Sequence, residues 1–399
     1  MPHLDRDFKL LAVANVLYAT GLGLYQQLLF VYALQLGASR FTIGLLNALM
    51  LGTIMLVNIP GAWAATRFRL KPVLVWTWWL LVPTSLSYFF APTWQWLIPG
   101  LVLFGLAYAN MPVFKAYIYL KSEPASVGAS MAFIFGSYSL GLVAAPFIGG
   151  WIADRAGMRI VFLLSTVAYA LSATAVSFLH DTPNHPPAEK WRVVDLLGSR
   201  AFRGHLAFFF VGFLAVYIAQ PFINPFLAQA HHQSYAALGL YSSLVALGTV
   251  VLMQVAGRLV DRWGARAGAG SALGLIVVGC LLLLAGAGPA AWAPAMLCFG
   301  ALDTLRLMPS MFLPDTFGHV PLQWGYAVFD TATGVPMVCG AALGGLLYRT
   351  SYGLPFRATM VIAAGLIVLV LLRGPVADRP PSGRSDPDEQ PRGLPSDPD

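Results

Sequence analysis

The sequence predicts an all-α membrane protein in which twelve transmembrane helices form two pseudo-symmetric six-helix bundles. Hydrophobic residues make up 58% of the chain and charged residues only 10%, whereas soluble domains carry about 25% charged residues. Apolar runs of about 20 residues, the length that crosses a bilayer, recur along the chain. Backbone polar groups in hydrocarbon must be bonded internally, and the alternating pattern of a membrane barrel is absent, so these runs are predicted as helices.

Charge and turn clusters separate the apolar runs into twelve segments. The polar stretch 180–203 divides them six and six, and the tail 374–399 is rich in Pro, Ser, Gly and Asp and is expected to be disordered. The predicted units are therefore an N-terminal bundle (1–180), a central cytoplasmic loop (181–203), a C-terminal bundle (204–373) and the tail. The predicted spans are 9–35, 42–64, 72–91, 95–120, 127–152, 159–179, 204–229, 235–257, 268–287, 291–313, 325–348 and 355–373.

The basic residues between the spans predict the orientation. With the N-terminus inside, sixteen Lys and Arg residues fall in inner segments and five in outer loops. The positive-inside rule then places both termini in the cytoplasm, and we expect an inner (plasma) membrane of a bacterium. Because these residues form no basic face with interleaved aromatic residues, we expect the lipid bilayer as partner and no nucleic acid.

The two halves repeat at an offset of 194 to 196 residues. Compositional bias toward Gly and Leu is the alternative explanation, but it does not account for the repeated glutamines. Parallel repeats related by an axis along the membrane normal are typical of transporters. The matched residues are Gln26 with Gln220, Gln35 with Gln229, Gly52-Thr53 with Gly248-Thr249, Gly105 with Gly300, and Gly149-Gly150 with Gly344-Gly345.

A loop after the eighth span carries a specific motif. It matches G-x-x-x-D-R-x-G-x-R, and on this motif the chain resembles the major facilitator superfamily of transporters. The resemblance implies the two-bundle fold around a central cavity and a loop that braces the outward-open state. The equivalent loop of the first half has Ala65 and Phe68 where the acid and the second Gly should stand. The motif residues are Gly257, Asp261, Arg262, Gly264 and Arg266.

The fifth span carries a second motif, which resembles the G-x-x-x-G-P-x-x-G-G of the family's antiporters. Small residues at this spacing allow close helix packing, so packing and antiport are both open interpretations. The basic residue that family members carry near the middle of the fourth span is missing, and Lys115 lies further inward. This absence argues against a drug/proton antiporter. The motif residues are Gly141, Ala145, Pro146, Gly149 and Gly150.

Three charged residues at membrane depth are the candidates for proton coupling or gating: Asp303, Arg306 and Asp330. Such charges are costly in a membrane and are functional candidates for that reason. Asp303 and Arg306 are three residues apart and share a helix face. Two interpretations stay open for them, an internal ion pair and a protonatable carboxylate held by the arginine.

Five amide side chains are the candidates for substrate binding. The resemblance implies that spans one, four, seven and ten line the central cavity, where these residues fall. Hydrogen bonding between helices is the alternative role. The candidates are Gln26, Gln27, Asn110, Gln220 and Asn224.

Enzyme motifs such as H-E-x-x-H, G-x-S-x-G and the phosphate loop are missing from the sequence. We therefore expect no enzyme activity, no cofactor and no metal. The predicted function is secondary transport of a small organic solute by alternating access, first as proton-coupled efflux by an antiporter that works as a monomer. Uptake or facilitated diffusion of a sugar-like or other polar metabolite is the alternative, and a membrane receptor or membrane-embedded enzyme is the alternative outside transport.

Overall fold

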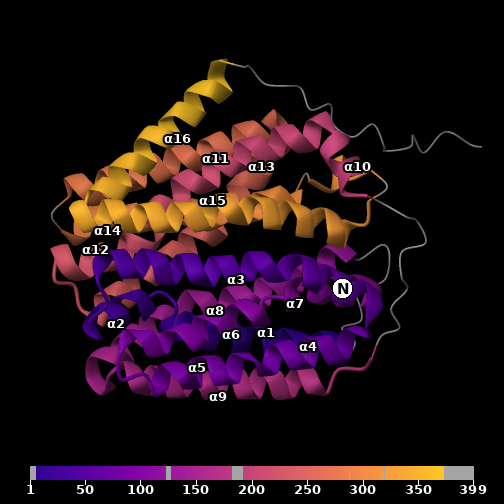
Figure 1. Ribbon diagram of the computed structural model, residues 1–399, viewed down its shortest axis with the longest axis horizontal. Helices are drawn as coiled ribbons and strands as arrows, with labels where there is room; N and C mark the ends of the chain where they lie inside the picture. Colours follow the sequence, from indigo (N-terminus) through magenta and orange to yellow (C-terminus); the bar gives the residue numbers. More distant parts are fainter. Residues whose placement is uncertain are drawn as a thin grey trace, which may run out of the picture.

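The structure is a computed structural model that describes residues 6–122, 127–181, 192–286, 288–311, 313–318 and 320–372. The tail 374–399 and most of the central loop lie outside these residues. Within the described part of the chain the secondary structure is helical and contains no strand. Figure 1 shows two layers of helices, with α1 to α9 in the lower half of the view and α10 to α16 in the upper half.

The N-terminal layer contains α1 (Arg6–Tyr25), α2 (Leu29–Gln35), α3 (Arg40–Arg67), α4 (Leu70–Trp79), α5 (Leu81–Phe89), η1 (Trp94–Trp96), α6 (Leu97–Ala107), α7 (Asn110–Lys121), α8 (Val127–Ala156) and α9 (Met158–Ser177). The C-terminal layer contains α10 (Val193–Gly198), α11 (Arg200–Ala219), η3 (Gln220–Phe222), α12 (Ile223–Ala230), α13 (Tyr235–Ala285), α14 (Pro289–Leu307), η4 (Met308–Met311), η5 (Leu313–Thr316), α15 (Leu322–Thr350) and α16 (Leu354–Leu372). The layers meet where α15 packs on α3 and α13 packs on α8.

Ten helical stretches of the described residues are long and apolar enough to cross a membrane. The predicted spans 72–91 and 291–313 are not among the ten, although most of each is helical. The first is split at Leu80 into the short helices α4 and α5, and in the second Asp303 and Arg306 lower the hydropathy of α14. Twelve membrane-crossing helices therefore stay a prediction, while the helical fold is confirmed.

Helix α13 contains both predicted spans, 235–257 and 268–287, which appear as two separate membrane-crossing stretches, Tyr235–Val260 and Gly268–Ala285. It is one helical run of 51 residues, which would be about 76 Å long if straight, far more than a bilayer needs. A Cβ placed at Gly268 would lie 2.7 Å from Cγ2 of Val260, although eight residues separate them. The run therefore turns back between its apolar stretches Tyr235–Val260 and Gly268–Ala285.

The turn of α13 carries the motif of the eighth loop. Arg262 is exposed there. The side chains of Asp261 and Arg266 and the surroundings of Gly264 are not described, so the predicted brace stays a prediction.

Repeat-related residues make equivalent contacts in the two halves. A Cβ placed at Gly105 of α6 would lie 2.5 Å from Cβ of Thr53 of α3. In the other half, a Cβ at Gly300 of α14 would meet the backbone of Gly248 and Thr249 of α13. The same small residue thus allows the same helix pair to pack closely in each bundle, as the offset of the repeat predicts.

The first and seventh spans are interrupted at repeat-related positions. Helix α1 ends at Tyr25, and a turn beginning at Gln26 leads into α2. Helix α11 ends at Ala219, and the 3₁₀ turn η3 beginning at Gln220 leads into α12. Pro221 predicts the second break, whereas the first contains no proline and follows only from the repeat.

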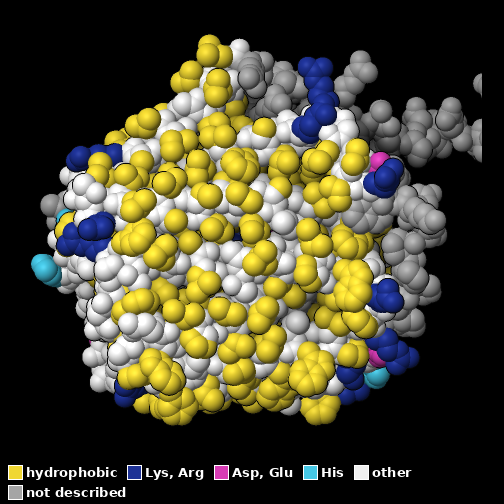
Figure 2. All heavy atoms as spheres, viewed as in Figure 1, with side chains coloured by type: hydrophobic (Ala, Val, Ile, Leu, Met, Phe, Trp, Pro, Cys, Tyr) yellow, Lys and Arg dark blue, Asp and Glu magenta, His cyan; other side chains and the backbone are white. Residues whose placement is uncertain are grey.

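The visible surface has charged residues at its two ends and an apolar band between them (Figure 2). Figure 2 shows Lys and Arg side chains toward the left and right of the view, with hydrophobic side chains across the region between them. This pattern fits a surface that faces lipid. We call the end with α2, α12 and the start of α13 the outer end, following the orientation predicted from the charges.

Candidate functional site

A central polar cluster joins the two halves at membrane depth. It consists of Tyr108, Lys115, Asp303, Arg306 and Asp330. Tyr108 lies in the turn between α6 and α7, and Lys115 lies on α7. Asp303 and Arg306 lie on α14, and Asp330 lies on α15. The structure therefore brings the three predicted coupling residues together with two residues of the N-terminal half.

Arg306 is the centre of this cluster. Its Nη2 donates a hydrogen bond of 3.3 Å to the hydroxyl of Tyr108 across the two halves. Asp303 and Asp330 both interact electrostatically with Arg306, and Asp330 also interacts with Lys115. The guanidinium thus has a neutral hydrogen-bond partner and two carboxylates within its field.

The cluster contains no contact ion pair. Among the described residues, the salt bridges within 4.0 Å are Arg69–Asp181, Lys121–Asp7 and His180–Asp7, all of them outside the cluster. The ion pair between Asp303 and Arg306 that the sequence left open is therefore not formed in this conformation.

The members of the cluster keep some accessible surface. Asp330 is exposed and Asp303, Arg306 and Lys115 are half-buried, although atoms of both halves surround them. The Lys115 Nζ lies 4.6 Å from the ring centroid of Tyr326 on α15, which is a cation–π contact between the halves.

The amide candidates divide into two groups. Asn224 is 6% exposed, and its Nδ2 donates to the carbonyl of Gln27 at 2.8 Å and to Oγ of Ser242 at 3.0 Å. These bonds join α12 to the turn after α1 and to α13, so the structural alternative describes Asn224 best. Gln26 and Gln220 are half-buried at the helix breaks.

Gln27 is exposed and Asn110, the first residue of α7, is buried. Substrate contact by the amides other than Asn224 stays a prediction.

The motif of the fifth span packs α8 between two helices. A Cβ at Gly141 would lie 2.7 Å from Cβ of Ala19 on α1. Ala145 and Pro146 lie against Gly23 of α1, and Gly149 lies against the carbonyl of Leu24. Gly150, the last residue of the motif, lies against α13 of the other half. Each small residue of the motif thus has a packing role here.

Two pairs of glycines close the outer end. A Cβ at Gly150 of α8 would lie 3.1 Å from Cα of Gly239 on α13, and a Cβ at Gly345 of α15 would lie 3.1 Å from Cα of Gly44 on α3. Gly44 and Gly239 are themselves 195 residues apart, as are Gly150 and Gly345. The two crossings are therefore related by the repeat, and each brings one helix of one half against a helix of the other.

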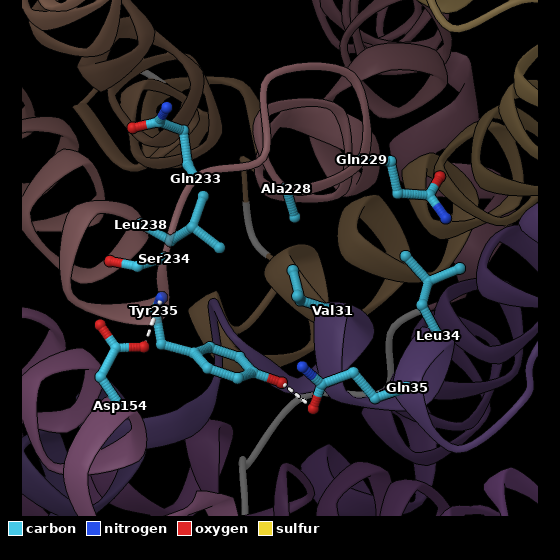
Figure 3. A pocket seen from close by; sticks show the side chains of 10 residues that line it. All are labelled: Val31, Leu34, Gln35, Asp154, Ala228, Gln229, Gln233, Ser234, Tyr235 and Leu238. Carbon is cyan, nitrogen blue, oxygen red and sulfur yellow. Dashed lines mark hydrogen bonds between the residues drawn. The ribbon is translucent and has the colours of Figure 1, made fainter.

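Asp154 adds a polar lock to this closure, which sequence reasoning missed. Its carboxylate, at the end of α8, accepts hydrogen bonds from the backbone amides of Tyr235 at 2.9 Å and Ala236 at 2.8 Å. A negative charge at the start of α13 is stabilised by the helix dipole. The Tyr235 hydroxyl donates to Oε1 of Gln35 at 2.7 Å, as Figure 3 shows.

The signal in the sequence was an acidic residue, Asp154, shortly after the motif of the fifth span. The sequence did not indicate that this residue contacts the start of α13. The lock borders a pocket of about 410 Å³ at the outer end, seen in Figure 3. The pocket is lined by Val31, Leu34, Gln35, Asp154, Ala228, Gln229, Gln233, Ser234, Tyr235 and Leu238.

Replacing Asp154 by Asn removes the charge and keeps the size. We expect a destabilisation of the outer closure by about 0.3–1 kcal/mol, and up to about 2 kcal/mol if the contact is shielded from water. This corresponds to a twofold to thirtyfold shift toward an outward-open state. The measurement is the labelling rate of Gln220→Cys by a membrane-impermeant maleimide added outside, in a chain whose native cysteines are replaced by Ser. An unchanged rate would show that Asp154 does not contribute to the closure.

Among the described residues, no three His, Cys, Asp or Glu side chains gather in a way that could hold a metal ion.

The helical fold agrees with the comparisons with known proteins. The model of the Major Facilitator Superfamily matches residues 11–304 and 205–396. The chain belongs to the major facilitator superfamily. The family match and the curated transporter relatives support a multi-pass membrane protein of the transporter type.

Curated relatives and solved structures agree with this family. The MFS-type transporter ppzB of Metarhizium majus is 24% identical over 310 residues, which are 61% of this chain and 66% of that protein. The ppzB of Metarhizium rileyi is 25% identical over 146 residues, 36% of this chain and 30% of that protein. The chain thus matches from about a third to just under two thirds of the length of these relatives.

Among solved structures, the nucleoside transporter NupG has a TM-score of 0.69 at 15% identity, covering 92% of this chain and 98% of that chain. A POT family transporter in complex with a thioalcohol-conjugated peptide has a TM-score of 0.74 at 14% identity, with 92% and 96% covered. At these identities the likeness shows the fold alone.

Proposed function

We propose that this protein is a proton-coupled antiporter that exports a small organic solute, with Asp303 of the central polar cluster as the proton-carrying group. The observation that carries the proposal is the arrangement around Arg306. Asp303 and Asp330 interact with Arg306 electrostatically but do not form a salt bridge with it. Arg306 instead donates a hydrogen bond to Tyr108 of the opposite half. A carboxylate that is reachable by solvent and not committed to an ion pair can take up and release a proton.

The contact between Arg306 and Tyr108 supplies the link to alternating access. Because the two residues belong to opposite halves, their hydrogen bond must lengthen or break when the halves rock. Arg306 then loses its neutral partner, and an ionised Asp303 one helical turn away becomes the favoured partner. Protonation of Asp303 reverses this preference. Proton binding and the position of the halves are thus coupled through one guanidinium.

The direction of transport is proposed from the motif of the fifth span. With the glycine crossings and the Asp154 lock formed, a solute reaches the cluster from the opposite end, which the Lys and Arg distribution places in the cytoplasm. The motif of the fifth span, which resembles that of antiporters, forms part of this closure through Gly150. The resemblance of this motif to that of antiporters favours loading from inside and release outside.

Uptake or facilitated diffusion of a polar metabolite is the second candidate. Gln26 and Gln220 favour it, because they place amide groups at the related breaks of the first and seventh spans. Backbone groups freed at such breaks can bind a polar solute. Asp330 and Lys115 would then act as gate residues.

The two candidate functions differ in whether and in which direction a pH gradient drives the solute. The protein is reconstituted in proteoliposomes, and a panel of organic solutes selected by thermal stabilisation is offered on both sides. We expect one of them to be concentrated against its gradient, and to move opposite to the proton when only a pH difference is imposed. Equilibration without concentration would favour facilitated diffusion, and movement with the proton would favour uptake.

We further propose that both termini lie in the cytoplasm, in the inner membrane of a bacterium. Reporter fusions after Arg203 and after Arg266 should then read cytoplasmic, and a fusion after Ser234 should read external. The physical reason is the excess of Lys and Arg on the inner side. An external signal after Arg266 would invert the orientation and, with it, the direction of transport proposed here.

A further inference from the structure

The charges of the central polar cluster are balanced in sign but not paired. Lys115 and Arg306 are cations, and Asp303 and Asp330 are anions. No cation of the cluster lies within 4.0 Å of one of its carboxylates among the described residues. Opposite charges at membrane depth that do not pair with each other leave electrostatic stabilisation unrealised.

The chemistry of a solute decides how much of this stabilisation it can recover. A neutral solute leaves all four charges as they are, and a solute of one sign compensates one half of the cluster only. A solute that carries both signs can compensate both. Its own charges lose water on entry, and they regain partners only where cations and anions are available together.

We propose that the transported solutes are zwitterions of amino-acid or short-peptide type, whose carboxylate binds Arg306 and whose ammonium group binds Asp330. This inference rests on the proposed transport function and specifies the substrate class of the same site. It leaves Asp303 free for the proton.

The two assignments rest on the unused donors of Arg306 and on the exposure of Asp330. The Arg306 guanidinium has five N–H donors, and the structure records one hydrogen bond, to the neutral hydroxyl of Tyr108. Its planar fork therefore has donors left for the two oxygens of a carboxylate. Asp330 is more exposed than Asp303. An ammonium group can therefore bind Asp330 with less displacement of the surrounding side chains.

Lys115 is held away from direct competition for Asp330. Its Nζ lies over the ring of Tyr326 at 4.6 Å from the centroid, and it interacts with Asp330 through the field rather than by contact. An ammonium group of the solute can thus reach Asp330 while Lys115 remains over the aromatic ring.

The test uses the purified full chain and thermal stabilisation as the signal of binding. The probes are the twenty common amino acids and a set of apolar dipeptides, followed by the methyl ester and the N-acetyl derivative of each zwitterion that binds. For zwitterions without a charged side chain, the ester keeps only the cation and the N-acetyl derivative keeps only the anion. We expect at least one zwitterion to bind at least tenfold more tightly than both of its derivatives.

Two variants connect this preference to the named residues. Arg306→Gln should remove the preference for the zwitterion over its ester, and Asp330→Asn should remove the preference over its N-acetyl derivative. Each variant should leave the other preference in place, which a general loss of folding cannot produce. Arg69→Gln, at the surface ion pair with Asp181, should change neither.

The proposal is overturned if no zwitterion stabilises the protein, if a derivative binds as tightly as its parent, or if both variants weaken all probes equally. Proton-driven transport of a solute of another class would in that case leave the proposed function standing. Zwitterion binding without proton-driven flux would overturn the proposed function and keep the assignment of the solute.

Discussion

Replacing Asp303 by Asn is expected to abolish concentration of the solute by a pH gradient, with a loss of at least tenfold in the driven flux. Asn has nearly the same size but cannot exchange a proton, so the coupling step is removed while the cavity keeps its shape. Exchange of solute at equal pH on both sides should remain measurable. The measurement is flux in proteoliposomes with and without a pH difference.

The matched control for this variant is Asp181→Asn, which removes a carboxylate from the surface pair with Arg69. It should leave both fluxes unchanged, since exposed ion pairs contribute little. If the Asp303→Asn protein still concentrates solute under a pH difference alone, Asp303 has a structural role. Asp330→Asn would then be the remaining test of proton coupling within the cluster.

Replacing Gly239 by Trp is expected to hold the outer end open. Its Cα position lies against Gly150 and the carbonyl of Pro146 on α8, so an indole cannot enter while the helices cross at this distance. Overpacking of this kind costs about 1–3 kcal/mol or more, which shifts a two-state equilibrium fivefold to 150-fold. Net transport should fall by a similar factor, because the inward-loading state becomes rare.

The labelling rate of Gln220→Cys from outside is the direct measure of this opening. Gly274→Trp provides the control on the same helix, because a Cβ at Gly274 meets no atom within 4 Å. Gly345→Trp, at the crossing related by the repeat, should act like Gly239→Trp. Slow external labelling in both folded variants would contradict the assignment of the crossings as the outer closure.

The sequence predicted the helical fold because composition and run length constrain it strongly. The repeat relates contacts of the two halves: the contact between Thr53 and Gly105 has its counterpart between Gly248-Thr249 and Gly300, at the matched positions. It could not predict that the chain stays helical through the turn of α13, or that Leu80 divides the third span. Both depend on how a helix bends against its neighbours, which a hydropathy pattern does not contain.

The site was predictable only in part, for a related reason. Charges at membrane depth identified Asp303, Arg306 and Asp330, since few residues of that kind occur there. The partners Tyr108 and Lys115 belong to the other half, and helix periodicity does not indicate which residues meet across two bundles. The contact of Asp154 with the start of α13 could not be predicted for the same reason, because it also joins the two halves.

The measurement that tests the account most directly is proton flux driven by a solute gradient alone. Proteoliposomes contain a pH-sensitive dye, no pH difference is imposed, and a zwitterion that stabilises the protein is added on one side. We predict that the wild-type protein moves protons in the direction opposite to the solute, and that the Asp303→Asn protein moves solute without protons. Proton movement of equal size in both proteins, or none in the wild type while solute still flows, would contradict proton coupling through the central polar cluster.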